Sequence, residues 1–502
     1  MQVPGPAKLS LLLLLAGLLL LTSVPARAQT DQPDTDAVRA GVQEIFSMMM
    51  LGAVSTQDQV VEVTRTGSDY HVRLPLKAFT APPGAALEGV VRPLAGGVWD
   101  VASLTFPSAG TIEPPGPKEG ITQMQYSIGE QSIHARVDPG FLYPSTVAAD
   151  FRTIRLRSDQ GVVHSEQDLG RYVIDANVSA ETAGRIDFAS HAKLTDWHIL
   201  AHAPNGFDAD GLARSLSANA AAEGLDRVQG QRLLTATRAF LAAARPEPLE
   251  ASLPGTHTPP PPRAMSPGAR QTLRTIVDTI PGLLTRFNVE ESADGIRFTG
   301  ATATGGAPTG GTIERVRLAM AGESVQERIN AHMDIGLDEL RMASLPADTA
   351  AYLPHHVEIR SVMAGVPTGA LTALMHAATE PDADFAALLP QVAALFGNPD
   401  ARIGIQSFSF DSGPLRMTGW VHFVQRAGGA IGTDVHVAAT GMDAFMAGAQ
   451  GNPALQQVQP MLFMAKGMGR PDGQGMTWDI SVGGGPMTVN GTPFGQPPAR
   501  TR

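Results

Sequence analysis

The sequence predicts an α+β fold, in which mainly antiparallel, twisted β-sheets carry covering helices and the chain forms two related halves. Apolar and polar residues alternate with period two in many segments, among them residues 172–178, 186–194, 316–320, 329–335 and 476–482. Such alternation places one face of a strand on a core and the other in water. Apolar residues at helical spacing precede the first strands of each half, which predicts a helix at both places.

The first 28 residues are interpreted as a secretory signal peptide. Lys8 supplies a positive start, residues 11–21 form an apolar run, and Ala26, Arg27 and Ala28 form a small-x-small cleavage site before Gln29. The run is shorter than the roughly 20 apolar residues that cross a bilayer. We therefore expect an exported chain, with an uncleaved anchor as the alternative.

Composition excludes several classes of function. The chain has no cysteine, so disulfides, thiol catalysis and cysteine-ligated metals are ruled out. Its formal charge is −11, and loss of Lys8 and Arg27 with the signal peptide makes the remainder more negative. This charge argues against nucleic acid and anionic membrane surfaces as partners. No later segment is apolar for long enough to predict an integral membrane span after signal cleavage.

A proline-rich linker, residues 246–267, is predicted to separate two β-rich halves. The N-terminal half comprises residues 29–245 and the C-terminal half residues 268–502. Prolines lack a backbone N–H and favour extended conformations, which is typical of a spacer. Docking of a proline-binding partner on residues 259–262 is the less favoured alternative.

Both halves begin with the same pattern, which suggests an internal repeat. Helical spacing from Thr35 onward is followed by two predicted strands around a turn at residues 67–69. In the second half Ser266 and Pro267 form a helix start signal. A hairpin around Asp294 and Gly295 is then expected. The similarity is one of pattern and not of residue identity.

A recurrent Gly-apolar-Asp motif at the ends of predicted strands is interpreted as a structural elbow. The glycine would let the chain turn sharply, and the aspartate would cap the helix that follows. The elbow residues are Gly206, Asp208, Gly336, Asp338, Gly365, Gly441 and Asp443, with Pro367 and Thr368 replacing the aspartate after Gly365. Because capping explains these carboxylates, we assign none of them to catalysis.

The histidines form no convincing catalytic or metal motif. His198 and His202 have the spacing of a helical zinc pair, but the glutamate expected between them is absent. The adjacent His355 and His356 point apart on a strand or a helix. The sequence contains no short nucleophile, phosphate-loop, dinucleotide or calcium motif. We therefore expect a non-enzymatic protein with no catalytic residue, no cofactor and no metal.

A methionine-rich segment, QPMLFMAKGMGR at residues 459–470, is the one candidate for ligand contact. Met461, Leu462, Phe463 and Met464 would give an adaptable surface for an acyl chain or a partner helix, because methionine side chains fit irregular shapes. A core-facing helix that covers a sheet is the alternative explanation, and the one we favour.

Two segments carry a family resemblance: LPHHVEIRSVMAGVP at residues 353–367 and MTWDISVGGGPMTVNGTPFG at residues 476–495. With the signal peptide and the strand-rich body, they resemble an uncharacterised family of exported Gram-negative proteins, and loosely the YdgA-like and AsmA-like periplasmic proteins. The resemblance covers mainly residues 268–495 and includes no chemical motif. It implies an elongated β-rich periplasmic protein, and lipid-related or envelope roles are those of AsmA-like members.

These observations lead to three functional hypotheses. In the first, a curved sheet holds lipid or an envelope component in an apolar groove; a closed core filled by side chains would argue against it. In the second, the protein has a structural or assembly role and pairs with an envelope protein through its sheet edges. The third is a hydrolase without a recognisable motif, which would require histidine, aspartate and a hydroxyl to converge in one cleft.

Overall fold

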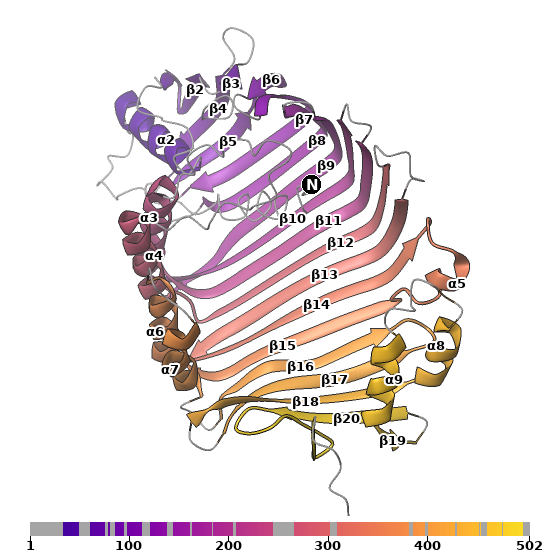
Figure 1. Cartoon of the computed structure of the whole chain (residues 1–502). Coiled ribbons are helices and arrows are strands. Elements are labelled where there is room, and N and C mark those ends of the chain that lie inside the picture. The colour runs from indigo at the N-terminus through magenta and orange to yellow at the C-terminus, as the bar shows by residue number, and fades with distance from the viewer. Residues whose placement is uncertain are drawn as a thin grey trace, which may run out of the picture. The chain divides into compact units, whose positions relative to one another are not determined.

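Long antiparallel strands dominate the structure, a computed structural model shown in Figure 1. The described residues are 34–49, 61–75, 79–80, 86–94, 98–112, 121–137, 144–160, 163–182, 184–203, 207–243, 266–301, 309–380, 385–396, 400–426, 429–450, 452, 459–473 and 475–494. The expected signal peptide and most of the expected linker lie outside these residues.

The chain divides into two compact units, and the division falls within β12 (Arg286–Ala301). Unit 1 comprises Met1–Val289, Gly300–Gly306 and Thr379–Pro381, and unit 2 comprises Glu290–Thr299, Ala307–Ala378 and Asp382–Arg502. The hairpin expected around Asp294 and Gly295 is wrong, because β12 is one continuous strand. Gly295 takes a φ of 61° inside this strand without reversing its direction.

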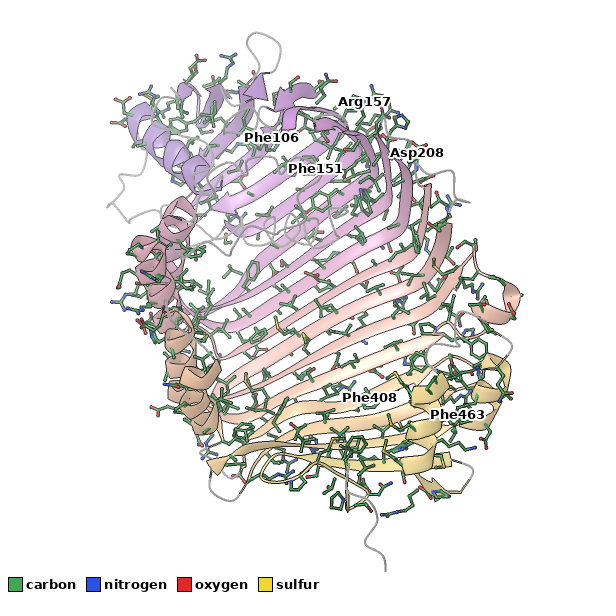
Figure 2. The ribbon with its side chains drawn as sticks, viewed as in Figure 1. Phe106, Phe151, Arg157, Asp208, Phe408 and Phe463 are labelled. Atoms are coloured by element: carbon green, nitrogen blue, oxygen red, sulfur yellow. The ribbon has the colours of Figure 1, made fainter. Side chains whose placement is uncertain are left out.

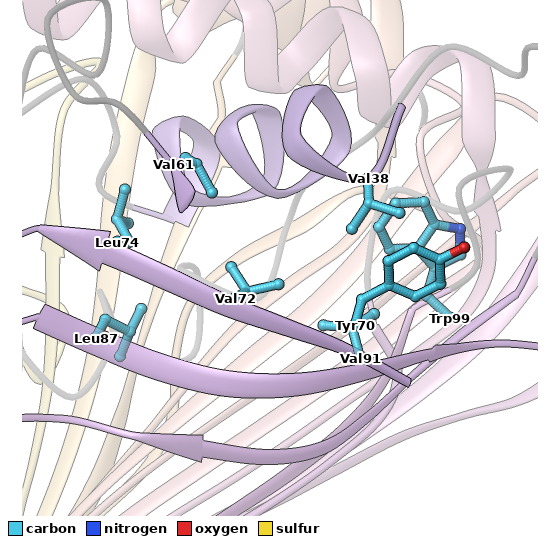
Figure 3. Close-up of a cluster of buried hydrophobic side chains, with 8 residues drawn as sticks. All are labelled: Val38, Val61, Tyr70, Val72, Leu74, Leu87, Val91 and Trp99. Atoms are coloured by element: carbon cyan, nitrogen blue, oxygen red, sulfur yellow. The ribbon is translucent and has the colours of Figure 1, made fainter. Parts of the chain in front are cut away.

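Unit 1 begins with a small antiparallel sheet and one covering helix. These elements are α2 (Thr35–Met49), β1 (Glu62–Thr66), β2 (Asp69–Pro75), β3 (Phe79–Thr80), β4 (Ala86–Pro93), β5 (Trp99–Thr105) and β6 (Ala109–Ile112). The predicted helix and the hairpin of β1 and β2 are both present, with Gly67 at a φ of 65° in the turn. Val38 of α2 packs with Tyr70 and Trp99 in a buried cluster (Figure 3).

Five long strands form the rest of the sheet in unit 1. They are β7 (Ile121–Val137), β8 (Pro144–Gln160), β9 (Val163–Thr182), β10 (Arg185–Ala203) and β11 (Phe207–Asp226). Each is antiparallel to the next, and β5 and β6 both pair with β7. The period-two segments predicted at residues 172–178 and 186–194 lie in β9 and β10, as expected.

At one level of the sheet, each of these five strands has one residue that is left out of the cross-strand pairing. Thr153 and Asp196 stand outside the regular pairing and have positive φ angles of 54° and 55°. Gly170 lies between them on β9, where a Cβ atom would approach the Cβ of Asp196 to 2.9 Å. Gly129 and Arg214 are skipped at the same level of β7 and β11. We call these five residues the bulge row.

The bulge row changes which side chains share a face. Phe151 and Ile154 are three residues apart and both are half-buried, whereas Arg152 and Arg155 are exposed. In a regular strand, residues three apart lie on opposite faces. The extra residue therefore keeps the apolar side chains on one side of the sheet along the whole length of the strands.

Two helices lie side by side at the strand ends of unit 1 (Figure 1). They are α3 (Arg227–Ala243) and α4 (Pro267–Thr279). The predicted start of α4 is confirmed, because Ser266 Oγ accepts a hydrogen bond from the Ala269 amide at 3.1 Å and Pro267 occupies the first turn. Leu233 of α3 packs on Ile186 and Leu225, which lie at the ends of β10 and β11.

Unit 2 contains a second run of antiparallel strands. They are β13 (Thr309–Val325), β14 (Arg328–Met342), β15 (His356–Pro367), β16 (Arg402–Asp411), β17 (Arg416–Gln425), β18 (Ile431–Thr440), β19 (Arg470–Asp472), β20 (Gly475–Val482), β21 (Thr488–Val489) and β22 (Thr492–Pro493). Pairing runs from β13 to β18 in chain order, then from β18 to β20, β21 and β22, with β19 also on β20.

The helices of unit 2 also pack at strand ends. They are α5 (Ala347–Ala350), α6 (Thr368–Ala378), α7 (Phe385–Leu395), α8 (Met442–Ala449) and α9 (Gln459–Met468). Leu371 of α6 and Leu395 of α7 pack on Val366, Ile403 and Ile431, which are terminal residues of β15, β16 and β18.

The predicted α+β class with covering helices is wrong, because the structure is predominantly β: 63% of the described residues are in strands and 22% in helices. In unit 2, strands β13–β18 have 10 to 17 residues, which corresponds to roughly 33–56 Å. Helices α6–α9 have 8 to 11 residues, or about 12–17 Å. Helices this short pack on the ends of long strands and leave most of a face uncovered.

Replacing Thr153 by glycine should raise the free energy of unfolding by about 1 kcal/mol, because a β-branched residue is strained at positive φ and glycine is not. The matched control is Thr146→Gly on the same strand, where Thr146 is paired with Arg136 and Asn177. That variant should lower the free energy of unfolding by up to ~1 kcal/mol. Denaturant titration measures both, and equal losses would contradict the bulge at Thr153.

Candidate functional site

The strand register of unit 2 aligns apolar side chains in rows across its sheet. Leu318, Ile335, Ile359 and Phe408 are successive cross-strand neighbours from β13 to β16. The rows on either side extend the same surface. We call it the apolar face; its members include Val316, Leu318, Met320, Met333, Ile335, Leu337, Val357, Ile359, Ile405, Phe408, Phe410, Val421, Phe423, Val435, Ile480 and Val482.

Much of the apolar face is open. Six of its side chains expose between 36% and 43% of their surface: Leu318, Met320, Met333, Ile335, Phe423 and Val482. Leu318 lies opposite Ile335, and Met320 lies opposite Met333, so these four form one contiguous group. A contiguous exposed apolar patch marks an interaction surface, whereas single exposed apolar residues are ordinary.

The opposite face of the same strands is charged and internally paired. Arg360 Nε donates to Asp334 at 3.0 Å, Arg416 Nε lies 2.9 Å from Asp411, and His356 Nδ1 lies 2.8 Å from Asp338. The hydrogen bond to Asp334 raises the pKa of the Arg360 guanidinium. These pairs are solvated, and each is worth less than about 1 kcal/mol. This charged face is therefore the side of the sheet that contacts water.

Helices α8 and α9 cover one end of the apolar face. Leu462 of α9 packs in a cluster that contains Phe445 and Trp478, and Trp478 Nε1 donates to the Ala465 carbonyl at 2.7 Å. The other side chains singled out from the sequence, Met461, Phe463 and Met464, are 65%, 52% and 53% exposed (Phe463 is labelled in Figure 2). The four residues are thus divided between the core and the surface.

The strand-glycine-helix order is present at two of the proposed elbows. Gly365, with a φ of 65°, precedes the end of β15 and the start of α6, and Gly441, with a φ of 79°, is the N-cap of α8. The expected cap by Asp443 is wrong, because Asp443 lies in the first turn of α8 and pairs with Lys466. Gly206 lies outside the described residues.

The elbow interpretation is wrong at Asp208 and Asp338. Asp208 lies in β11 and its carboxylate pairs with His202, while Asp338 lies in β14 beside His356. Gly336 is an interior residue of β14. In both cases the carboxylate pairs with a histidine on the neighbouring strand. The local sequence resembles a helix N-cap, but no helix begins at either residue.

The structure places His198 and His202 on β10 instead of a helix. His198 Nε2 lies 2.9 Å from Asp210, and His202 pairs with Asp208 on the same neighbouring strand. Within the described parts of the chain, no three His, Asp or Glu side chains are grouped closely enough to hold a metal ion. These pairs are accounted for as cross-strand contacts.

The sequence led us to expect an apolar groove but did not place it on these strands. Residues 316–320 and 329–335 were identified as strands with one apolar side, and that side was assigned to a core. The available signal was the small number of predicted helices relative to the many half-apolar strands. An apolar side without a helix to cover it stays exposed unless another layer packs on it.

Comparison with protein-family models, with curated proteins and with solved structures finds no significant match to this chain. Among the described residues, no helix combines the length and the apolar character needed to cross a membrane.

Asn490, in the VNG segment near the C-terminal end, ties α9 to β20. Its Nδ2 donates to the Met468 carbonyl at 2.8 Å, and its Oδ1 accepts from the Asp479 amide at 2.8 Å. Asn490 has a φ of 51°, a conformation that asparagine tolerates better than most residues. The segment therefore has a structural role: Asn490 holds α9 at the edge of the apolar face.

Replacing Asn490 by alanine should lower the free energy of unfolding by about 2–3 kcal/mol, since two hydrogen bonds are lost and alanine is strained at this φ. Hydrogen exchange at the Asp479 amide should accelerate. Asn490→Gly separates the two causes, because it loses the bonds but not the conformation and should cost about 1 kcal/mol less. Unchanged exchange in both variants would show that Asn490 does not protect the Asp479 amide.

Proposed function

We propose that this protein binds lipid acyl chains on the apolar face of unit 2 and catalyses no reaction. The observation that carries the proposal is the contiguous exposed group of Leu318, Met320, Met333 and Ile335 on a sheet whose other face is charged. Methionine side chains adapt to flexible ligands, which suits alkyl chains of varying length. We further propose that the chain is exported to the periplasm, in line with its N-terminal sequence.

The dimensions of the face fit an acyl chain. The six strands β13–β18 are neighbours in register. At a spacing of about 4.8 Å they form a surface roughly 24 Å wide. One leaflet of a bilayer has a hydrocarbon depth of about 15 Å. An extended acyl chain can therefore lie across the strands within the limits of the face.

Burial of the acyl chain's methylene groups contributes favourable free energy to binding. Each buried methylene contributes about 0.8 kcal/mol, so ten methylenes contribute roughly 8 kcal/mol. Loss of freedom on binding offsets several kcal/mol of this, so ten methylenes alone would bind more weakly than micromolar, and a phospholipid with two longer alkyl chains binds more tightly because it buries more methylenes. Affinity of this order allows a lipid to be held and released again, which suits a carrier better than a permanent structural lipid.

The charged face is poorly suited to bind an anionic lipid headgroup, which favours binding through the alkyl chain. Several of its arginines are already paired with carboxylates, as at Arg360 with Asp334 and Arg416 with Asp411. The net charge of the chain is −11, which disfavours binding driven by anionic headgroups. Recognition through apolar contact is therefore the mode that the composition and the geometry favour together.

Protein purified without detergent from the periplasmic fraction should carry phospholipid at near-stoichiometric amounts, measured by native mass spectrometry and lipid extraction. Replacing Leu318 and Ile335 together by glutamate should reduce the bound lipid about twofold or more, because the charges would have to be desolvated beneath an alkyl chain.

The matched control is Ser407→Glu with Thr418→Glu, two exposed positions on the charged face of the same sheet. This variant should retain its lipid and its thermal stability. A lipid-free wild-type protein would contradict the proposal and favour a protein partner on the apolar face, which affinity capture would then identify.

A further inference from the structure

Unit 1 contains a row of aromatic side chains on the apolar side of its long strands. Phe151 of β8 and Tyr172 of β9 are directly paired, with ring centroids 6.4 Å apart and planes 22° from parallel. Phe106, which follows β5, lies 6.4 Å from Phe151 (Figure 2). Leu194 of β10 is the next cross-strand neighbour of Tyr172 and is 3% exposed. The surroundings of Tyr172 are thus apolar on both sides.

The row is fixed by a fork of hydrogen bonds from Gln131. The Phe106 amide donates to Gln131 Oε1 at 2.8 Å, and Gln131 Nε2 donates to the Phe106 carbonyl at 2.7 Å. Gln131 is paired with Phe151 across β7 and β8. This half-buried amide therefore places Phe106 against Phe151 through two hydrogen bonds.

The hydroxyl of Tyr172 lacks a partner. Its oxygen is buried, and no hydrogen-bonding atom of the described residues lies within reach. Burial raises the pKa of Tyr172 to about 12, so the phenol remains a hydrogen-bond donor at neutral pH. Leaving such a donor unpaired is unfavourable, and phenylalanine would fill the same space without that cost. The hydroxyl therefore indicates an acceptor that the described residues do not supply.

We propose that Tyr172 is the polar anchor of a second lipid site, in unit 1, where its hydroxyl donates a hydrogen bond to the ester carbonyl of a glycerolipid whose acyl chain lies on the aromatic row. The inference rests on the proposed function, because it assumes that acyl lipids are the ligands of this protein.

The chemistry of the surroundings selects a neutral acceptor. A free carboxylate would have to give up its hydration among Phe151, Tyr172 and Leu194, and the structure places no cation beside the Tyr172 hydroxyl among the described residues. An ester carbonyl accepts one hydrogen bond, carries no charge and is attached to the alkyl chain that the apolar surface would bind. An ether-linked lipid has the same alkyl chain without that carbonyl.

The test compares a short-chain diester phosphatidylcholine with its diether analogue by titration calorimetry. The full chain carries Leu318→Glu and Ile335→Glu, so that binding reports on unit 1. The diester should bind about tenfold more tightly, which corresponds to about 1.4 kcal/mol. Adding Tyr172→Phe should abolish the preference and leave the affinity for the diether unchanged. Its thermal stability should not fall, because no native hydrogen bond is lost.

Tyr126→Phe is the matched control, since Tyr126 is a buried tyrosine on β7 of the same sheet, and this variant should keep the preference. Equal binding of the two lipids, or a preference that survives Tyr172→Phe, would overturn the anchor. Absence of binding to the Leu318→Glu, Ile335→Glu chain would overturn the unit 1 site alone if the wild-type protein still binds lipid. Absence of binding to the wild type would overturn the proposed function as well.

Discussion

The structure depends on keeping the side-chain alternation of neighbouring strands in phase. Each long strand hydrogen-bonds to its neighbours, so a shift of one residue in one strand would move its apolar side chains to the charged face. In unit 2 the row from Leu318 to Phe408 is directly paired, and a bulge between Ile405 and Phe408 of β16 keeps both side chains on the apolar face. In unit 1 the same result requires the bulge row, because alternation restarts there on every strand. The separation into an apolar and a charged face follows from this single constraint.

The charged face and the apolar face contribute differently to stability. Pairs such as Arg360 with Asp334 contribute little to stability in water, but they specify which side of the sheet is solvated and oppose stacking of a second layer on it. The apolar side gains its stability from contacts between cross-strand neighbours, even where no helix covers it. Helices such as α6 and α8 close the ends of the strands, where apolar residues would otherwise meet water at a sheet terminus.

Local pattern was sufficient to predict many strands, because period-two alternation is a property of the strand itself. The strand at residues 476–482, the helix from Thr35 and the start of α4 at Ser266 were all predicted from neighbours in sequence. The elbows at Asp208 and Asp338 were not, since their partners His202 and His356 become visible only once the strands are paired. The fold class was wrong for a related reason: alternation predicts an apolar side but not what covers it. For the candidate site, the sequence identified the strands that carry it but not their exposure.

The bulge row has a consequence for how this chain can change. Gly129, Thr153, Gly170, Asp196 and Arg214 occupy one level of five strands, and each adds a residue that its neighbours match. Deleting the extra residue from one strand would put half of that strand out of phase with both neighbours. An insertion or deletion of one residue at this level would therefore require the same change in all five strands, from Gly129 to Arg214. Related chains should be of equal length here, and their variation should be concentrated in the turns.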